Sequence, residues 1–133
     1  MITAFYTVLV DGDDMNEPIA DAVRGILDGH IVLDRDLANK GQYPAINVLK
    51  SVSRLMNHIA SPEHVEAANK IRQLYYKYAE HEDVINIGAY KRGTSQEVDE
   101  AIEYEPLITN FLKQSFNDNI TAEETVQELI QLA

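Results

Sequence analysis

The chain is 133 residues long, carries a net charge of −11 and contains no cysteine. Its length suffices for one ordinary domain but not for two large ones, and the lack of cysteine excludes disulfides and thiolate metal sites. A surface of this acidity repels phosphate backbones, so direct binding to nucleic acid is disfavoured.

The excess of acidic residues is larger in the second half of the chain. Residues 1–60 carry 5 basic and 8 acidic side chains, whereas residues 61–133 carry 6 and 14. An acidic C-terminal half would attract a basic protein partner. The same charge would also keep a protein soluble without any partner, and the composition leaves both interpretations open.

The first expected element is a strand over residues 2–10. These residues are mostly β-branched, aromatic or aliphatic, without alternation, a pattern typical of a strand buried on both faces of a parallel sheet. A protein rarely begins with its most buried strand. We therefore expect the chain to be a piece of a larger protein.

An acidic loop follows over residues 11–18, with the sequence Asp-Gly-Asp-Asp-Met-Asn-Glu-Pro. Its turn-forming residues predict that the strand ends here. The clustered carboxylates raise the question of a calcium site, but the EF-hand pattern needs its glycine at another position. A solvated loop, or one that touches a partner, fits the sequence better.

A helix, a strand and a short helix are expected next. Apolar residues recur at helical spacing at four positions: Ile19, Val23, Ile26 and Leu27. Gly29 should stop this helix. Residues 30–33 then predict a second buried strand, which would complete a right-handed βαβ unit, and residues 34–40 predict a short helix ended by Gly41. Two strands alone are not a stable sheet, so we expect the rest of the sheet outside this chain.

From Ser61 onward the sequence predicts helices. Ser61 is a suitable cap in front of Pro62 at the first helical position. Apolar residues then line one helical face: Val65, Ala68, Ile71, Leu74, Tyr75 and Tyr78. The tyrosines, together with Tyr76, would suit a stacking platform, but tyrosines at helical spacing more often belong to a core with a wet hydroxyl.

Two further helices are expected beyond a loop at residues 85–93, which contains two glycines and a Lys-Arg pair. Residues 94–97 and 121–124 have capping-box spacing and predict where these two helices begin. Pro106 lies inside the first of them and should kink or divide it.

No complete catalytic motif is present. The chain has neither a Gly-x-x-x-x-Gly-Lys-[Ser/Thr] phosphate loop nor a Gly-x-Gly-x-x-Gly segment. Its four histidines are scattered, without metal-ligand spacing, and Ser53 has no nearby histidine and aspartate pattern that would mark a nucleophile. As a freestanding enzyme, the sequence lacks a site.

Several ordered blocks nevertheless resemble the type III secretion ATPases, which are relatives of the catalytic subunits of rotary ATP synthases. The blocks are residues 13–21, 27–33, 43–46 and 51–54. Residues 87–93 and the helix after them resemble the flagellum-specific branch of Gram-positive bacteria in particular. Versions from virulence secretion systems share the early blocks, so the flagellar system is the preferred interpretation and the virulence system the alternative.

The resemblance implies a mainly helical chain with a truncated α/β part. Residues 1–60 would be the C-terminal portion of a parallel-sheet nucleotide-binding domain with a βαβ unit, and residues 61–133 a helical C-terminal domain. The phosphate loop, the magnesium-positioning acid and the catalytic glutamate would lie upstream. The full-length chain would therefore be an ATP hydrolase that uses ATP with Mg²⁺, whereas this piece alone would be inactive and would hold no metal ligand.

The same resemblance implies roles for particular residues. Arg54 would act as an arginine finger, inserted into the nucleotide site of a neighbouring subunit. Tyr43 would stack on adenine, with Phe116 as a second aromatic of that pocket. Asp13 and Glu17 would touch a central stalk. The loop over residues 88–93, which we call the basic loop, and the helix after it would occupy the region of the torque-transmitting segment of the synthases.

The implied partners are those of a secretion apparatus. The full-length protein would form a homo-hexamer in the cytoplasm, peripheral to the membrane, at the cytoplasmic face of the inner-membrane export apparatus. Its partners would be a coiled-coil stalk protein, a negative-regulator or stator protein and the export gate, and no nucleic acid. An alternative of a different class is that the piece serves by itself as a helical module that binds a stalk protein or the export gate.

Overall fold

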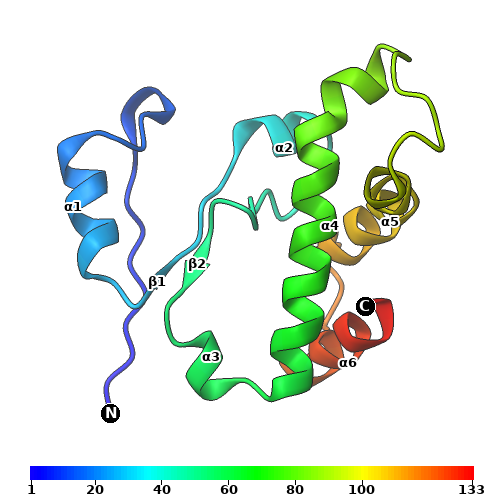
Figure 1. The fold of residues 1–133 in the computed structure, drawn as a ribbon. Coiled ribbons are helices and arrows are strands. Elements are labelled where there is room, and N and C mark those ends of the chain that lie inside the picture. The colour runs from blue at the N-terminus through cyan, green and yellow to red at the C-terminus, as the bar shows by residue number, and fades with distance from the viewer.

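The computed structural model describes all of residues 1–133 and is mainly helical, with one very small sheet. This agrees with the expected fold class. Figure 1 shows two portions side by side: we call residues 1–60 the N-terminal portion and residues 61–133 the helical portion. The elements are, in order, the 3₁₀ turn η1 (Asp11–Asp13), α1 (Pro18–Ile26), β1 (Gly29–His30), α2 (Arg35–Asn39), β2 (Val52–Ser53), α3 (Met56–Ile59), α4 (Pro62–Asn86), α5 (Gln96–Leu112) and α6 (Ala122–Leu132).

The helical portion has a core of its own. The long helix α4 packs against α5 and α6, as Figure 1 shows. The central core residues are Ile71, Leu74, Ala101 and Ile108. Tyr75 and Tyr78 pack against this core, whereas Tyr76 is exposed. The core interpretation of the first two tyrosines is thus confirmed.

Capping side chains define where the three long helices begin. The Ser61 side chain accepts a hydrogen bond from the backbone N–H of His64, as expected. Thr121 and Glu124 form the predicted capping box at α6. At α5 the expectation was one residue too early, because the cap is Ser95 rather than Thr94. The helix α5 also continues through Pro106, so the proline does not divide it.

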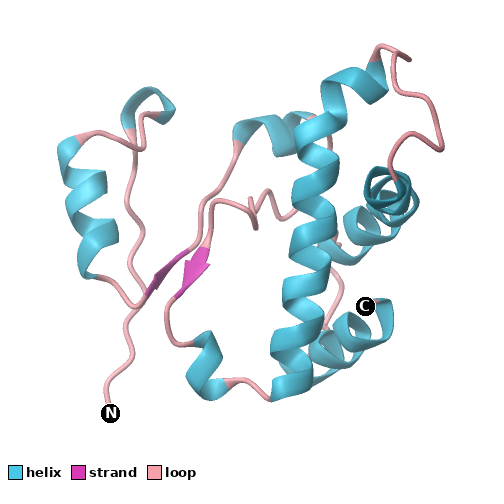
Figure 2. Cartoon of the chain, in the orientation of Figure 1, coloured by secondary structure: helices cyan, strands magenta, loops and turns pink.

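The strand expected at residues 2–10 does not form in this chain. The segment is extended, but none of its backbone groups takes part in a hydrogen bond, and Figure 2 draws it as a loop. Its apolar side chains are exposed; Phe5, for example, is 93% exposed. A strand needs a neighbouring strand to satisfy its backbone donors and acceptors, and no segment of this chain forms such hydrogen bonds with residues 2–10.

The sheet that does form is antiparallel, which corrects the expected parallel βαβ pairing. Gly29 pairs with Ser53 and His30 with Val52, because the loop that carries α2 reverses the chain direction between them (Figure 2). A side chain at Gly29 would place its Cβ 2.8 Å from the carbonyl oxygen of Val52, so the close approach of β1 and β2 requires glycine there. Among residues 30–33 only Val32 is buried, so this segment is not a strand buried on both faces.

Candidate functional site

The aromatic end of the segment Tyr43–Arg54 lies against the helical portion. The carbonyl oxygen of Tyr43 accepts a hydrogen bond of 2.8 Å from the backbone N–H of Gln114, just after α5. The Tyr43 side chain is 55% exposed, and Phe116, two residues beyond Gln114, is fully exposed. The structure therefore brings together the two chain segments that carry the predicted adenine-pocket aromatics, with both rings open to solvent.

The middle of this segment is held by Asp34, which precedes α2. One carboxylate oxygen caps α2 by accepting from the N–H of Asp36. The other accepts from the Asn47 side-chain amide at 2.8 Å and lies 3.4 Å from the Lys50 ammonium. The hydrogen bond from Asn47 is the main cause that lowers the pKa of the Asp34 carboxyl below its ordinary value of 3.8. Asp34 is thus an ionised anchor for the loop between α2 and β2.

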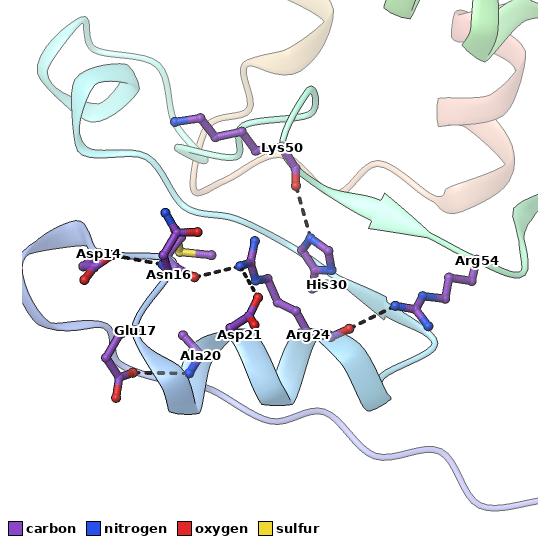
Figure 3. A network of polar contacts seen from close by, with 10 residues as sticks. Asp14, Asn16, Glu17, Ala20, Asp21, Arg24, His30, Lys50 and Arg54 are labelled. Atoms are coloured by element: carbon purple, nitrogen blue, oxygen red, sulfur yellow. Dashed lines mark hydrogen bonds and ion pairs between the residues drawn. The ribbon is translucent and has the colours of Figure 1, made fainter.

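Arg54 follows β2 directly, and its side chain is exposed. Its backbone N–H donates to the carbonyl oxygen of Asp28 at 2.8 Å. The guanidinium donates to the carbonyl oxygens of Arg24 at 3.2 Å and Gly25 at 3.4 Å, near the end of α1 (Figure 3). No carboxylate lies within 4.0 Å of it. The Arg54 guanidinium is therefore held by backbone carbonyls and not by a salt bridge.

The acidic loop in front of α1 has a defined conformation. Asp14 accepts from the N–H of Asn16 at 3.0 Å, and Glu17 caps α1 by accepting from the N–H of Ala20 at 3.2 Å (Figure 3). Arg24 ties the loop to the helix, because its guanidinium donates to the carbonyl oxygen of Met15 at 2.8 Å. Among the two predicted stalk residues, Glu17 is thus engaged as a helix cap.

Asp13, the other predicted stalk residue, lies at the tip of the loop. Its exposed carboxylate forms an ion pair of 3.3 Å with Arg35, which is equally exposed. An ion pair between two exposed side chains contributes at most about 1 kcal/mol to stability. The Asp13 carboxylate can therefore leave Arg35 for a basic partner at little cost.

The basic loop between α4 and α5 is also ordered by hydrogen bonds. Asp99, in the first turn of α5, accepts from the Tyr90 hydroxyl and from the N–H of Gly93, each at 2.8 Å. Arg92 lies 3.5 Å from Glu103, whereas Lys91 has no acidic partner within 4.0 Å. The loop thus presents one unpaired cation at the far end of α4 (Figure 1).

The predicted site residues fall into two groups. The segments that carry Tyr43 and Phe116 are joined by the hydrogen bond from Gln114 to the Tyr43 carbonyl, whereas Arg54 and the acidic loop lie at opposite ends of α1 (Figure 3). The sequence reasoning missed Arg24, Asn47 and Gln114, which hold these groups in place. Their partners lie 9 to 71 positions away along the chain, so no local spacing could have revealed them. Asp34 could have been recognised, because aspartate before a short helix is a common cap.

The structure contains no cluster of three or more histidine, aspartate and glutamate side chains arranged to hold a metal ion. None of its helices combines the length and the apolar character needed to cross a membrane.

Two family descriptions match the chain, one for each portion. Residues 1–53 match the nucleotide-binding domain of the ATP synthase alpha/beta family. Residues 60–131 match the C-terminal domain of the type III secretion ATPase EscN.

Curated relatives align over nearly the whole chain. The flagellum-specific ATP synthase of Bacillus subtilis is 64% identical over 131 residues, which are 98% of this chain and 30% of that protein. The SPI-2 type 3 secretion system ATPase of Salmonella typhimurium is 50% identical over 131 residues, again 98% of this chain and 30% of the relative. The chain thus spans about a third of the length of the relatives it matches.

Solved structures agree with these relationships. The assembled ATPase EscN of the enteropathogenic E. coli type III secretion system superposes with a TM-score of 0.89 at 43% identity, over 96% of this chain and 31% of that chain. EscN in complex with its central stalk EscO superposes with a TM-score of 0.79 at 42% identity, over 87% of this chain and 29% of that chain.

Proposed function

The chain belongs to the family of type III secretion ATPases, relatives of the ATP synthase alpha/beta subunits, and from this membership we propose that it works as the C-terminal part of a longer ATP hydrolase that energises flagellar protein export. The 64% identity to a flagellum-specific relative supports the flagellar system. A virulence secretion system is the second candidate, because a relative from such a system reaches 50%.

In this proposal the two portions are parts of two domains. Residues 1–60 complete a nucleotide-binding domain, and residues 61–133 form a helical C-terminal domain. The separate core of the helical portion supports this division. The exposed apolar side chains of residues 2–10 support it as well, since they would be covered by the remainder of the first domain.

Arg54 is proposed to stabilise the charge that develops when the terminal phosphate of ATP is transferred to water. A planar guanidinium donates paired hydrogen bonds to phosphate oxygens, and an arginine finger supplies about 10³–10⁵ in turnover. The observation that carries this role is the state of the side chain: it is exposed and held only by two backbone carbonyls at 3.2 and 3.4 Å. Neutral acceptors are easier to leave than a carboxylate, so the guanidinium is free to turn toward a neighbouring subunit.

Tyr43 and Phe116 are proposed to bind the adenine base. Both rings are exposed, and the hydrogen bond between Gln114 and Tyr43 keeps their segments together. The two rings would bind the adenine end of one ATP molecule. Arg54 would contact the phosphates of a second ATP molecule, in the site of the neighbouring subunit. The bound Mg²⁺–ATP would supply the phosphoryl group to be transferred, while this chain's own residues orient the base and compensate charge. No metal ligand is assigned to this chain, and the chain alone is proposed to be inactive.

The acidic loop is proposed to contact a central stalk. The complex of EscN with its central stalk EscO supports such a partner, and the weakly paired Asp13 is the side chain best placed to respond to it. Glu17 would contribute less, because it caps α1. Replacing Asp13 by lysine in the full-length protein should weaken stimulation by the stalk protein, and unchanged stimulation would refute this contact.

The remaining partners follow from the same proposal. The full-length protein would assemble as a homo-hexamer in the cytoplasm, at the export apparatus of the inner membrane, with a stator protein and the export gate as further partners. The related EscN has been solved as an assembled ATPase, which supports assembly of the full-length protein.

The experiment that tests the proposed function is the replacement of Arg54 by alanine in the full-length protein. Binding of ATP should remain, because adenine contacts are intact, while turnover should fall by about 10³–10⁵. Arg35→Ala removes an arginine that is also exposed and pairs only with Asp13, so it serves as the control and should keep basal turnover. Near-normal turnover of Arg54→Ala would refute the role.

A further candidate of a different class, a helical module that works by itself, is favoured by the separate core of the helical portion. Isothermal titration of the 133-residue chain with Mg-ATP should give no measurable binding under either proposal. Titration with the stalk protein separates them, because tight binding by the isolated chain would support the module.

A further inference from the structure

The segment that leads into Arg54 is held by its carbonyl groups. Three successive carbonyl oxygens, those of Leu49, Lys50 and Ser51, all accept hydrogen bonds from side chains. Arg72 of α4 donates to Leu49 at 2.9 Å and, at 3.4 to 3.5 Å, to Ser51. The imidazole of His30 lies 3.2 Å from the carbonyl oxygen of Lys50 (Figure 3). The backbone three to five residues before Arg54 is thus fixed from both sides.

Arg72 makes no ion pair, and its hydrogen bonds all go to the N-terminal portion. No carboxylate lies within 4.0 Å of its guanidinium, although the helical portion is strongly acidic. All its hydrogen bonds go instead to the loop before β2. The fork of an arginine can reach two carbonyls at once, which a lysine ammonium does less well.

The loop has its own anchors on the side away from α4. The Ser51 hydroxyl donates to the carbonyl oxygen of Asn47 at 2.6 Å and accepts from the N–H of Val32 at 3.0 Å. The position of Ser51 is therefore passed on to β1 and its neighbours, which pair with the residues around Arg54. A shift of Arg72 relative to β1 must move either the loop or the base of Arg54.

Other contacts join the helical portion to residues of the N-terminal portion that lie farther from Arg54 along the chain. Lys40 forms an ion pair of 2.9 Å with Glu82 of α4, and Gln114 donates to the Tyr43 carbonyl. Of these contacts, those of Arg72 reach the residues nearest in sequence to Arg54, namely Leu49 and Ser51. Arg72 itself lies near the middle of α4, the longest helix. It is consequently the side chain through which α4 can set the position of that arginine.

We propose that Arg72 is a positioning residue for phosphoryl transfer: by holding the carbonyls of Leu49 and Ser51 it fixes the base of Arg54, so that the guanidinium meets the phosphates of the neighbouring subunit. This inference rests on the role proposed for Arg54. It adds that the placement of the helical portion controls that arginine. Movement of α4 under a partner would then change turnover without changing contacts to the adenine base.

The test uses the full-length protein with Arg72→Gln, Arg72→Lys and the control Lys77→Gln. Lys77 lies on the same helix and pairs with Glu80 and Glu97, away from the loop. Misplacement of a reacting group by about 1 Å costs on the order of 100-fold. We expect Arg72→Gln to lower kcat by about 10- to 100-fold at an unchanged KM for ATP, Arg72→Lys to recover part of the loss, and Lys77→Gln to behave as the unaltered protein.

A second measurement separates positioning from mere support of the fold. Binding of ADP is compared with and without aluminium fluoride, which mimics the transferred phosphoryl group. Arg72→Gln should weaken binding of the fluoride complex but not of ADP alone, and it should have no further effect in protein that already carries Arg54→Ala. If Arg72→Gln does not fold, Arg72→Lys carries the same comparison.

The outcomes are distinguishable. Normal turnover by Arg54→Ala would refute the proposed function itself. Loss of turnover by Arg54→Ala together with normal kcat in Arg72→Gln would overturn only the positioning role. An Arg72→Gln effect that persists in the Arg54→Ala background, or an equal loss in Lys77→Gln, would also overturn it.

Discussion

The two portions of the molecule are stabilised in different ways. Of the nine buried residues, six lie in the helical portion, where α4, α5 and α6 enclose an apolar core. The N-terminal portion buries Ala20, Val32 and Gln42 only, and leaves large apolar side chains in solvent. It is held instead by polar contacts such as those of Asp34, Arg24 and Ser51. The helical portion thus has an apolar core of its own, while the N-terminal portion, which carries the candidate residues Tyr43 and Arg54, is held by a polar framework.

The difference in core packing between the two portions is tested most sharply by substituting two isoleucines, one in each portion. Ile108 in α5 is 1% exposed, whereas Ile26 in α1 is 83% exposed. Ile108→Ala should lower the free energy of unfolding of the 133-residue chain by about 2–5 kcal/mol, because it leaves a cavity in the core. Ile26→Ala should change it by less than about 0.5 kcal/mol. Urea denaturation measures both, and equal losses would show that the N-terminal portion has a core after all.

A matched pair of tyrosines sharpens the functional side. Tyr43 and Tyr76 are both 55% exposed, but only Tyr43 lies on the N-terminal portion beside Phe116's segment. Stacking of a base on an aromatic ring contributes about 1–3 kcal/mol. Tyr43→Ala should therefore weaken binding of a fluorescent ATP analogue to the full-length protein by about 5- to 150-fold, while Tyr76→Ala should leave the affinity unchanged. Equal affinities of the two variants would exclude stacking on Tyr43.

A smaller effect is expected at the capping box of α6. Thr121→Ala removes a side-chain acceptor for the N–H of Glu124 and should destabilise the chain by about 1 kcal/mol near neutral pH. Serine at the same position keeps the hydroxyl and is the control. Thermal unfolding of the two variants gives the comparison, and identical midpoints would show that the cap does not matter to the helical portion.

The same cap should give this loss a pH dependence. Hydrogen bonds from Thr121, first from its backbone and then from its side chain, hold the pKa of the Glu124 carboxyl below its ordinary value of 4.5. A lowered pKa stabilises the folded state above pH 4.5, and this contribution disappears as the pH falls through the folded-state pKa. The difference between Thr121→Ala and the unaltered chain should therefore shrink in acid. A constant difference would contradict the cap as the source.

The sequence predicted the helical portion well because its signals are local. Ser61 and the capping box at Thr121 fix helix starts over four residues, and Ile71, Leu74 and Tyr75 repeat at helical spacing. The predicted start of α5 was one residue too early because Thr94 is an equally good cap in sequence. In the structure the Thr94 hydroxyl donates to the carbonyl of Lys91, and Ser95 caps the helix. Pro106 does not divide α5, which continues to Leu112; packing of α5 against α4 offsets the hydrogen bond that the proline cannot donate.

The N-terminal portion was predicted less well because its structure depends on distant pairs. Residues 2–10 have the composition of a strand but no partner in the chain, and β1 pairs with β2 across more than twenty residues. Arg72 and Gln114, which hold the site segment, gave no sequence signal for the same reason. Resemblance to a family predicted roles for Tyr43 and Arg54, whereas the contacts that hold their segments became visible only in the structure.

The central claim is that Arg54 completes the nucleotide site of a neighbouring subunit. It is tested most directly by mixing two full-length variants that should be inactive, Arg54→Ala and one that lacks the lysine of the phosphate loop that the family resemblance implies upstream. In a mixed assembly the second variant offers its Arg54 to the intact phosphate loop of the first, so turnover should reappear on mixing although each variant alone is inactive. If the mixture stays as inactive as its components while mass measurement shows mixed assemblies, Arg54 does not act across the subunit boundary.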